Sequence, residues 1–374
     1  MLADSPRTET WGHGPQASVI VPVRNGEKTL GRTLHAISAS QGVARLEVIV
    51  VDDGSSDSSA AIASSFSCKV ICCGQGAGPA AARNRGAEAA SAPKLIFVDA
   101  DVFVRPDTLS RLINALDDWP AAFATYDPEP LNRNFATLLY HALSCLSLED
   151  TGELTPVFYS YCASIRKDLF LRMGGFDTSF TSATFEDMEL GWRLAARGLL
   201  SHHIRTARVD HAVQYTLSRL ARAYFRKSRD LAFLLLSHHT LTFDDQGWTR
   251  RKHWATLICA WTTLGLWPFA VWLHPLWGVP WGLAMGGFTL ASAPVYRAMA
   301  ERRWIYGPLS IFAYLGIHLI ATAAMLSGGL RFFCRRLSCA GRGLQRGDGK
   351  RVGGSQGGVL HESTSHHSDI QRSS

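Results

Sequence analysis

Two carboxylates follow the segment Leu95–Val98, which is wholly apolar and has the length of a short buried strand. They are Asp99 and Asp101, separated by a single alanine. Carboxylates two residues apart on a turn can share one hard divalent cation, and Mg²⁺ is commonly held by one or two carboxylates together with substrate phosphates. A lone Asp-x-Asp is a weak signal, but its place after an apolar strand favours a Mg²⁺ or Mn²⁺ site.

Two further acidic pairs stand at segment boundaries. Asp52 and Asp53 directly follow Leu46–Val51, which is apolar except for Glu47, and Glu186 and Asp187 begin a segment with helical spacing. Helix capping is the alternative at both places: it explains Asp57 or a serine after the first pair, because Asp and Ser are preferred N-caps, and the helix dipole favours the acids of the second pair. Capping does not explain two adjacent acids at a strand end, so we interpret Asp52 and Asp53 as facing a ligand cleft.

The loop Gly74–Pro79 contains three glycines and leads into an alanine-rich segment that includes Arg83. A glycine-rich loop ahead of a helix N-terminus suits a phosphate group. The spacing is not that of a dinucleotide-binding fingerprint, and the loop follows a third strand rather than the first. The alternative is an ordinary connecting loop.

These residues need a scaffold that brings them to one edge, and the apolar pattern indicates which one. Short β-rich segments alternate with segments of helical spacing in the series Ala17–Val23, Glu27–Ser40, Leu46–Val51, Ser58–Ser65, Lys69–Cys72, Pro79–Ala90 and Leu95–Val98. This alternation predicts an α/β fold with a parallel sheet and helices on both faces. Ligands of such sheets bind beyond the carboxyl ends of the strands, where the acidic pairs fall. After residue 107 the pattern is less regular and indicates mixed α/β structure.

Five motifs, taken in order, resemble those of family 2 glycosyltransferases of the GT-A fold. They are Val51–Asp57, Ala82-Arg83-Asn84, Asp99-Ala100-Asp101, Gly174-Gly175-Phe176-Asp177 and Glu186-Asp187, and Val21–Glu27 is similar to the family's opening strand and loop. The resemblance covers about residues 17–240. It implies a Rossmann-like domain that binds a UDP- or GDP-linked sugar, a divalent metal that bridges the diphosphate, and transfer that inverts the anomeric centre.

The resemblance also implies a role for each matching residue. The nucleotide-sugar would be bound by Pro22, Arg24, Glu27, Asp52, Asp53, Arg83 and Asp99. Asp52 or Asp53 would hydrogen-bond the base, and Arg83 would help to hold the nucleotide. Asp99 would lie by the ribose or the metal, Asp101 would ligate the Mg²⁺ or Mn²⁺, and Asp187 would be the general base for the acceptor hydroxyl.

Two departures from the family pattern bear on the acceptor. Processive members carry Gln-x-x-Arg-Trp ahead of their membrane helices, whereas this chain has Gln214-Tyr215-Thr216-Leu217. The difference favours transfer of a single sugar over polymer synthesis. Tyr161–Ser164 stands where many relatives have Gly or Asn near the acceptor. We expect the acceptor to be a lipid or a lipid-linked saccharide, and the sequence leaves its identity open.

The last third of the chain has the composition of a membrane segment. Hydrophobic residues make up 47% of the chain and charged residues 18%, and the net charge of +7 is contributed entirely after residue 252. Three apolar runs, Trp254–Leu273, Leu276–Tyr296 and Gly307–Leu330, are each long enough to cross a hydrocarbon core of about 30 Å. They predict attachment to the cell membrane (inner or plasma membrane). The balanced charge of the first 252 residues argues against a nucleic-acid partner.

The predicted organisation has five parts. They are a flexible tail at 1–16, the GT-A domain at 17–213, an amphipathic interfacial helix and linker at 214–252, a transmembrane region of about three helices at 253–330, and a basic disordered tail at 331–374. No secretory signal is visible at the N-terminus, which predicts a cytoplasmic catalytic domain. A third full crossing would place Arg331, Arg335 and Arg336 outside, against the positive-inside rule. Either the third run is re-entrant or interfacial, or the rule fails here.

Two other functions fit parts of the pattern. A sugar nucleotidyltransferase on a similar fold would carry a glycine-rich loop with Arg and Lys in the first strand-helix turn, and Arg24-Asn25-Gly26 is only a thin match. A non-catalytic membrane scaffold that binds sugar nucleotides would have no need of the carboxylates of Asp101 and Asp187.

Overall fold

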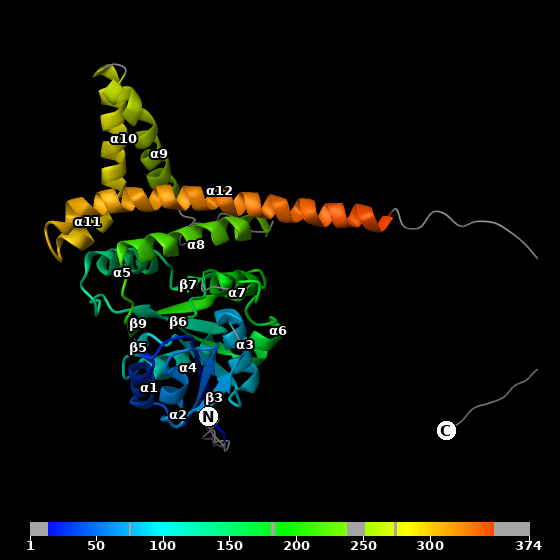
Figure 1. The fold of residues 1–374 in the computed structure, drawn as a ribbon. Coiled ribbons are helices and arrows are strands. Elements are labelled where there is room, and N and C mark those ends of the chain that lie inside the picture. Colours follow the sequence, from blue (N-terminus) through cyan, green and yellow to red (C-terminus); the bar gives the residue numbers. More distant parts are fainter. Residues whose placement is uncertain (1–13, 75, 181–183, 238–250, 273–274, 348–374) are drawn as a thin grey trace, which may run out of the picture. The chain divides into compact units, whose positions relative to one another are not determined.

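The computed structural model describes residues 14–74, 76–180, 184–237, 251–272 and 275–347 (Figure 1). The chain divides into two compact units, residues 1–330 and residues 331–374. Nearly all of the predicted N-terminal tail, most of the predicted linker after residue 237 and the end of the predicted basic tail lie outside the described residues.

The first half of the sheet is parallel, as the alternating pattern predicts. Its strands are β1 (Ala17–Val23), β2 (Leu46–Asp52), β3 (Lys69–Cys72) and β4 (Lys94–Val98), in the order β3-β2-β1-β4. Helices α1 (Leu30–Ser38), α2 (Ser59–Ser64) and α3 (Pro79–Ala89) connect them. Val23 pairs with Asp52, and Asp52 pairs with Cys72. The strands therefore end level with one another, and the residues that follow them share one edge.

The second half of the sheet is mixed. It consists of β5 (Val102–Val104), β6 (Ala121–Tyr126), β7 (Leu154–Thr155), β8 (Cys162–Arg166) and β9 (Ser201–His211). The order continues β4-β8-β6-β9-β5, and β7 pairs with β9. Strand β8 is antiparallel to both β4 and β6, whereas β6 and β9 are parallel. The helices of this half are α4 (Thr108–Asp118), α5 (Phe135–Glu149), α6 (Lys167–Arg172) and α7 (Glu186–Ala195).

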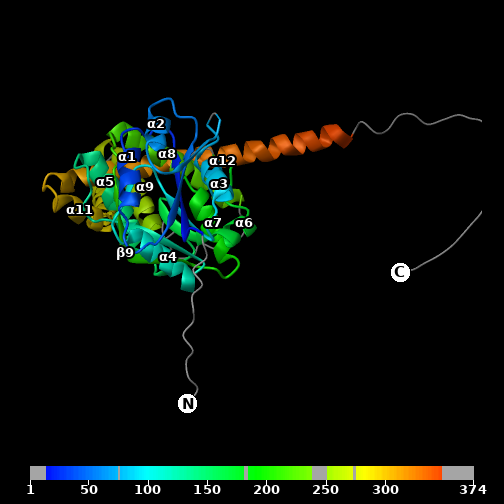
Figure 2. The ribbon, with the colours of Figure 1, turned by 90° about the horizontal axis from the view of Figure 1, so that it is seen from below.

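Helices cover both faces of the sheet, which confirms the predicted α/β architecture. One apolar core contains residues of α1, α2 and α4, and a second contains residues of α3, α6 and α7. Figure 2 shows α3, α6 and α7 gathered on one side and α1 on the other. Gly86 of α3 lies so close to Ile20 of β1 that any Cβ at this position would collide with its side chain. This close approach fixes α3, and with it Arg83, against the strands.

Helices make up the chain after β9. They are α8 (Leu217–Ser237), α9 (Arg251–Trp272), α10 (Gly278–Ala291), α11 (Ala293–Ala300) and α12 (Tyr306–Gly347), with a short 3₁₀ turn at Pro275–Trp277 before α10. Helix α8 lies within the segment 214–252, where the sequence predicts an amphipathic helix and linker. Within the described residues, two helical segments are long and apolar enough to cross a membrane, Ala255–Trp272 and Tyr306–Leu330.

The second predicted run, Leu276–Tyr296, does not form one long helix. It is divided between α10 and α11, and Ser292 ends the first helix and precedes the second. Pro294 lies in the first turn of α11, a position that suits proline because its missing N–H has no helical partner there. The run is free of charge, but Ser292 and Pro294 interrupt it.

The apolar helices pack on the part of the chain that contains the sheet, through α5 and α8. Leu138 and Tyr224 share a core with Phe288 and Tyr314. The indole N–H of Trp261 on α9 donates a hydrogen bond of 2.8 Å to Thr322 Oγ1 on α12. Helix α8 and the first part of α12 run side by side in Figure 1, where the backbone of Gly328 approaches the carbonyl of Arg229. Helices α9 and α10 form a hairpin that projects away from α8 and α12.

Candidate active site

A cavity of about 380 Å³ lies at the carboxyl ends of β1 and β4. Six residues predicted to bind the donor or the metal line it, namely Pro22, Arg24, Asp53, Arg83, Asp99 and Asp101. The sheet register brings them together from segments up to about eighty residues apart, because parallel strands end at one edge.

Asp53 holds the glycine-rich loop in place. Its Oδ1 accepts a hydrogen bond from the backbone N–H of Ala77 at 2.7 Å, and its Oδ2 accepts one from Gly78 at 3.0 Å. Gly78 has φ 92°, a left-handed conformation that favours glycine. The loop is therefore shaped by a carboxylate beneath it, and the side chain of Asp53 lies at the cavity wall.

The other two predicted donor residues stabilise local structure. Asp52 Oδ1 accepts a hydrogen bond of 2.9 Å from the N–H of Ser55 and so closes the turn after β2. Glu27 Oε2 accepts one of 3.3 Å from Ser58, at the start of α2. In this arrangement Asp53, rather than Asp52, faces the cavity.

Arg83 joins the two acidic clusters. It is only 2% exposed, and its guanidinium pairs with Asp99 at 2.6 Å and with Glu186 at 3.0 Å. Burial alone would lower the pKa of Arg83, but the charges of Asp99 and Glu186 raise it above its usual value. Arg83 is thus a fixed cation that holds the end of β4 against the start of α7.

Asp101 faces His211, which sequence reasoning missed. The His211 Nε2 lies 3.4 Å from Asp101 Oδ2, and β5 pairs with β9 so that Val102 is opposite His211. Burial would raise the pKa of Asp101, but the hydrogen bond and charge of His211 lower it below its usual value. No sequence spacing links these residues, since the pairing of β5 with β9 creates the contact.

The carboxylate oxygens of Asp99 and Asp101 suit a hard divalent ion. The side chains of Asp99 and Asp101 are 30% and 39% exposed toward the cavity. In the part of the chain that the structure describes, no three His, Cys, Asp or Glu side chains converge on one point. An ion that takes one or two carboxylates and completes its shell with phosphate oxygens fits this arrangement.

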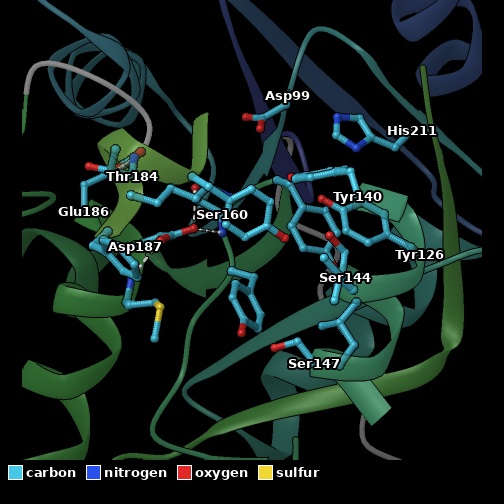
Figure 3. Close-up of a pocket in the computed structure, with 18 of the residues that line it drawn as sticks. Asp99, Tyr126, Tyr140, Ser144, Ser147, Ser160, Thr184, Glu186, Asp187 and His211 are labelled. Atoms are coloured by element: carbon cyan, nitrogen blue, oxygen red, sulfur yellow. Dashed lines mark hydrogen bonds between the residues drawn. The ribbon is translucent and has the colours of Figure 1, made fainter. Parts of the chain in front are cut away.

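A second cavity of about 240 Å³ adjoins the first and shares Arg83 and Asp99 with it (Figure 3). The carboxylate of Asp187 accepts hydrogen bonds from the N–H of Ser160 at 3.1 Å and of Met188 at 2.8 Å. In Figure 3, Asp187 and Ser160 lie on one side of this cavity, and Tyr126, Tyr140 and His211 lie across from them.

The pKa of Asp187 is raised to about 7. Burial is the largest cause and the charge of Glu186 the next, while the hydrogen bonds and Arg83 act in the opposite direction. From the sequence, the helix N-terminus is expected to favour the ionised carboxylate. Burial outweighs that effect here, and a carboxyl that titrates near neutral pH is well matched to general base catalysis.

Helices α5 and α8 contribute residues to the second cavity that the sequence did not single out as functional. Tyr140 and Ser144 come from α5, and Tyr215, Tyr224 and Lys227 come from the start of α8 and the segment before it. Of the segment Tyr161–Ser164, only Tyr161 lines the cavity, and its hydroxyl donates a hydrogen bond to the carbonyl of Ala124. Aromatic residues spaced along helices read as ordinary core positions in a sequence, so no pattern marked them.

Comparisons with known proteins agree with this geometry. Residues 18–174 match the family model described as glycosyl transferase family 2. Validoxylamine A glucosyltransferase of Streptomyces hygroscopicus subsp. limoneus is 29% identical over 231 residues, which cover 52% of this chain and 51% of that protein. The 4,4'-diaponeurosporenoate glycosyltransferase of Staphylococcus aureus (strain MRSA252) is 38% identical over 103 residues, 26% of this chain and 27% of that protein.

A solved structure shows the same fold. The mannosyltransferase PcManGT from Pyrobaculum calidifontis, in complex with GDP-Man and Mn²⁺, superimposes with a TM-score of 0.56 at 18% identity, covering 84% of this chain and 87% of that chain. The chain spans about half the length of the validoxylamine A glucosyltransferases that it matches.

Proposed function

Because this chain belongs to glycosyl transferase family 2 and has its GT-A fold, we propose that it transfers one sugar from a UDP- or GDP-linked donor to an acceptor hydroxyl. The observation that carries the proposal is the junction of two cavities. Asp99 and Arg83 line both of them, and a carboxyl with a pKa of about 7 lies in the second.

The first cavity would hold the nucleotide and the diphosphate. Pro22, Arg24 and Asp53 line the part nearest β1 and the glycine-rich loop, where the nucleoside would lie. Asp99 and Asp101 would hold a Mg²⁺ or Mn²⁺ ion, which stabilises the negative charge that develops on the leaving diphosphate. The mannosyltransferase PcManGT was solved in complex with GDP-Man and Mn²⁺, and its similar fold supports this assignment.

Asp187 would act on the acceptor. Its carboxylate would take the proton of the acceptor hydroxyl as the oxygen attacks the anomeric carbon and the bond to the nucleoside diphosphate breaks. A single displacement of this kind inverts the anomeric centre and needs no covalent intermediate. Ser160 and the N–H of Met188 hold the carboxylate in one orientation, which leaves it directed at the second cavity.

We propose that the acceptor is a lipid or a lipid-linked saccharide at the cytoplasmic face of the cell membrane. The walls of the second cavity come partly from α5 and α8, which share an apolar core with α10, α11 and α12. The relative named for 4,4'-diaponeurosporenoate supports an apolar acceptor. The relative named for validoxylamine A does not support one.

Release of nucleoside diphosphate tests this function. The full chain, placed in lipid nanodiscs with a membrane lipid extract as the source of acceptor, should release UDP or GDP from a set of nucleotide-sugars and should label one lipid fraction with the donor sugar. Formation of a nucleotide-sugar from sugar phosphate and nucleoside triphosphate would instead identify a nucleotidyltransferase. Tight donor binding without turnover, in the presence of Mn²⁺ and the lipid extract, would identify a scaffold.

A further inference from the structure

Helix α8 carries a cation on its buried face. Leu220, Tyr224 and Leu234 of this helix are buried, and Lys227 lies on the same stripe, three residues after Tyr224. The arginines at 219, 222 and 226 are exposed on the opposite side. On an amphipathic helix an apolar residue is expected at position 227. Exposure to solvent therefore does not explain a lysine at this position.

The ammonium of Lys227 faces aromatic rings rather than a carboxylate. Its Nζ lies 5.5 Å from the centre of the Tyr140 ring, and it lowers the pKa of Tyr215 against the stronger effect of burial. Across the ranges that the structure describes, no carboxylate lies within ion-pair distance of it. A partly buried charge is costly when it has no partner, and proteins normally pair such groups.

Lys227 lines the cavity that contains Asp187, and it does not line the nucleotide cavity. Arg83 and Asp99 line both cavities, whereas the residues of α5 and α8 line only the second. The diphosphate of the donor would lie with Asp99 and Asp101 in the first cavity. An anion that pairs with Lys227 would therefore belong to the acceptor rather than to the donor.

We propose that Lys227 binds an anionic group, a phosphate or a carboxylate, on an amphipathic acceptor whose apolar part lies against the tyrosines of this cavity. The inference rests on the proposed transfer reaction and adds the charge of the acceptor to it. The ring of Tyr140 positions the ammonium through a cation–π contact, and the anion takes the direct ionic contact.

The experiment measures binding, so it does not depend on turnover. Hexyl phosphate, hexanoate and hexan-1-ol are titrated against the full chain in phosphatidylcholine nanodiscs, with UDP or GDP and Mn²⁺ present, and affinities are measured by calorimetry. At least one of the two anions should bind more tightly than the alcohol. Comparison of the phosphate with the carboxylate then identifies the anionic group.

Variants separate Lys227 from surface charge. Lys227→Met should weaken binding of the preferred anion about tenfold or more, because charged hydrogen bonds contribute strongly to affinity. Lys227→Arg should largely restore it. The matched control is Arg226→Met, which removes an exposed charge one residue away and should leave the affinity unchanged. The affinity for UDP or GDP should be the same in all three variants.

Three results would overturn the inference. They are equal binding of the alcohol and both anions, an equal loss in Arg226→Met, and a loss of nucleotide affinity in Lys227→Met. The last would place Lys227 on the donor. Anion binding that depends on Lys227 in a protein that transfers no sugar would keep the subsite and reject the proposed function, so the two failures are distinguishable.

Discussion

At the scale of single residues, the site depends on how three carboxyl groups are held. Asp99 is paired with Arg83, Asp101 faces His211, and Asp187 is half-buried and accepts hydrogen bonds from backbone N–H groups. Their environments differ although all three are aspartates. Paired titratable groups in different surroundings are the usual basis for separate acid-base and binding roles.

We expect Asp187→Asn to abolish most transfer and to leave donor binding nearly intact. An amide preserves the shape and cannot take a proton, and general base catalysis contributes about 10²–10⁴-fold. Donor affinity and transfer rate should be measured on the same purified variant. Asp118→Asn, on the exposed side of α4, is a suitable control. Equal loss of affinity and rate would assign Asp187 to structure.

The raised pKa of Asp187 also predicts two pH effects. Transfer should increase with pH up to about 7 and then level off, because the base must be ionised.

The stability of the fold should change with pH in the opposite direction. The folded pKa exceeds the unfolded value of about 3.9, so this carboxyl stabilises the fold most below pH 4, and the contribution is lost as pH rises through 7. Thermal unfolding of Asp187→Asn should lack this component, and identical pH profiles for variant and wild type would contradict it.

Asp101→Asn should remove metal-dependent turnover. A neutral amide is a weaker ligand for Mg²⁺ or Mn²⁺ than a carboxylate. Activity is to be measured across a Mn²⁺ titration and in chelator. Normal turnover of the variant, or full wild-type activity in chelator, would reject the metal assignment.

At the scale of elements, the repeating part of the fold could be predicted and the long-range pairings could not. Strands β1 and β3 have the bounds that the apolar pattern predicts, because each is bounded by turn residues. His211 and Lys227 have no local signal. Each contacts a residue far along the chain, Asp101 for His211 and Tyr140 for Lys227, and periodicity carries no information about such contacts.

The contact between α8 and α12 gives a prediction at this scale. Gly328→Val should destabilise the full chain by about 1–3 kcal/mol, because its Cβ would collide with the backbone of Arg229. Gly316→Val on the same helix is the matched control, since no atom lies within 4 Å of the position that its Cβ would occupy. Thermal unfolding in detergent measures both. Equal effects of the two substitutions would show that helix propensity, rather than this contact, is responsible.

At the scale of the whole molecule, the apolar helices predict how the protein is attached. Side chains such as Trp272, Leu283 and Leu290 are largely exposed on α9 and α10. Exposed apolar surface of this extent is typical of a membrane interaction. We propose that the hairpin of α9 and α10 inserts into the bilayer and that α8 lies at its surface.

The full chain should therefore resist extraction by alkaline carbonate. A chain that ends at Asp245 lacks the helices after α8 and should lose most membrane association, while its basic helix retains a weak, salt-sensitive attachment. Fractionation of membranes after carbonate and after high salt distinguishes the two. Release of the full chain by carbonate would show that no helix spans the membrane.

The division of the second apolar run has a consequence for the surrounding lipid. At 1.5 Å per residue, the 22 residues of α9 extend about 33 Å, while the 14 residues of α10 extend about 21 Å. A hydrocarbon core is about 30 Å thick, so the arms of an inserted hairpin would match it unequally. The shorter arm would favour a locally thinned bilayer on its side, and hydrophobic mismatch of this kind would make activity sensitive to acyl-chain length.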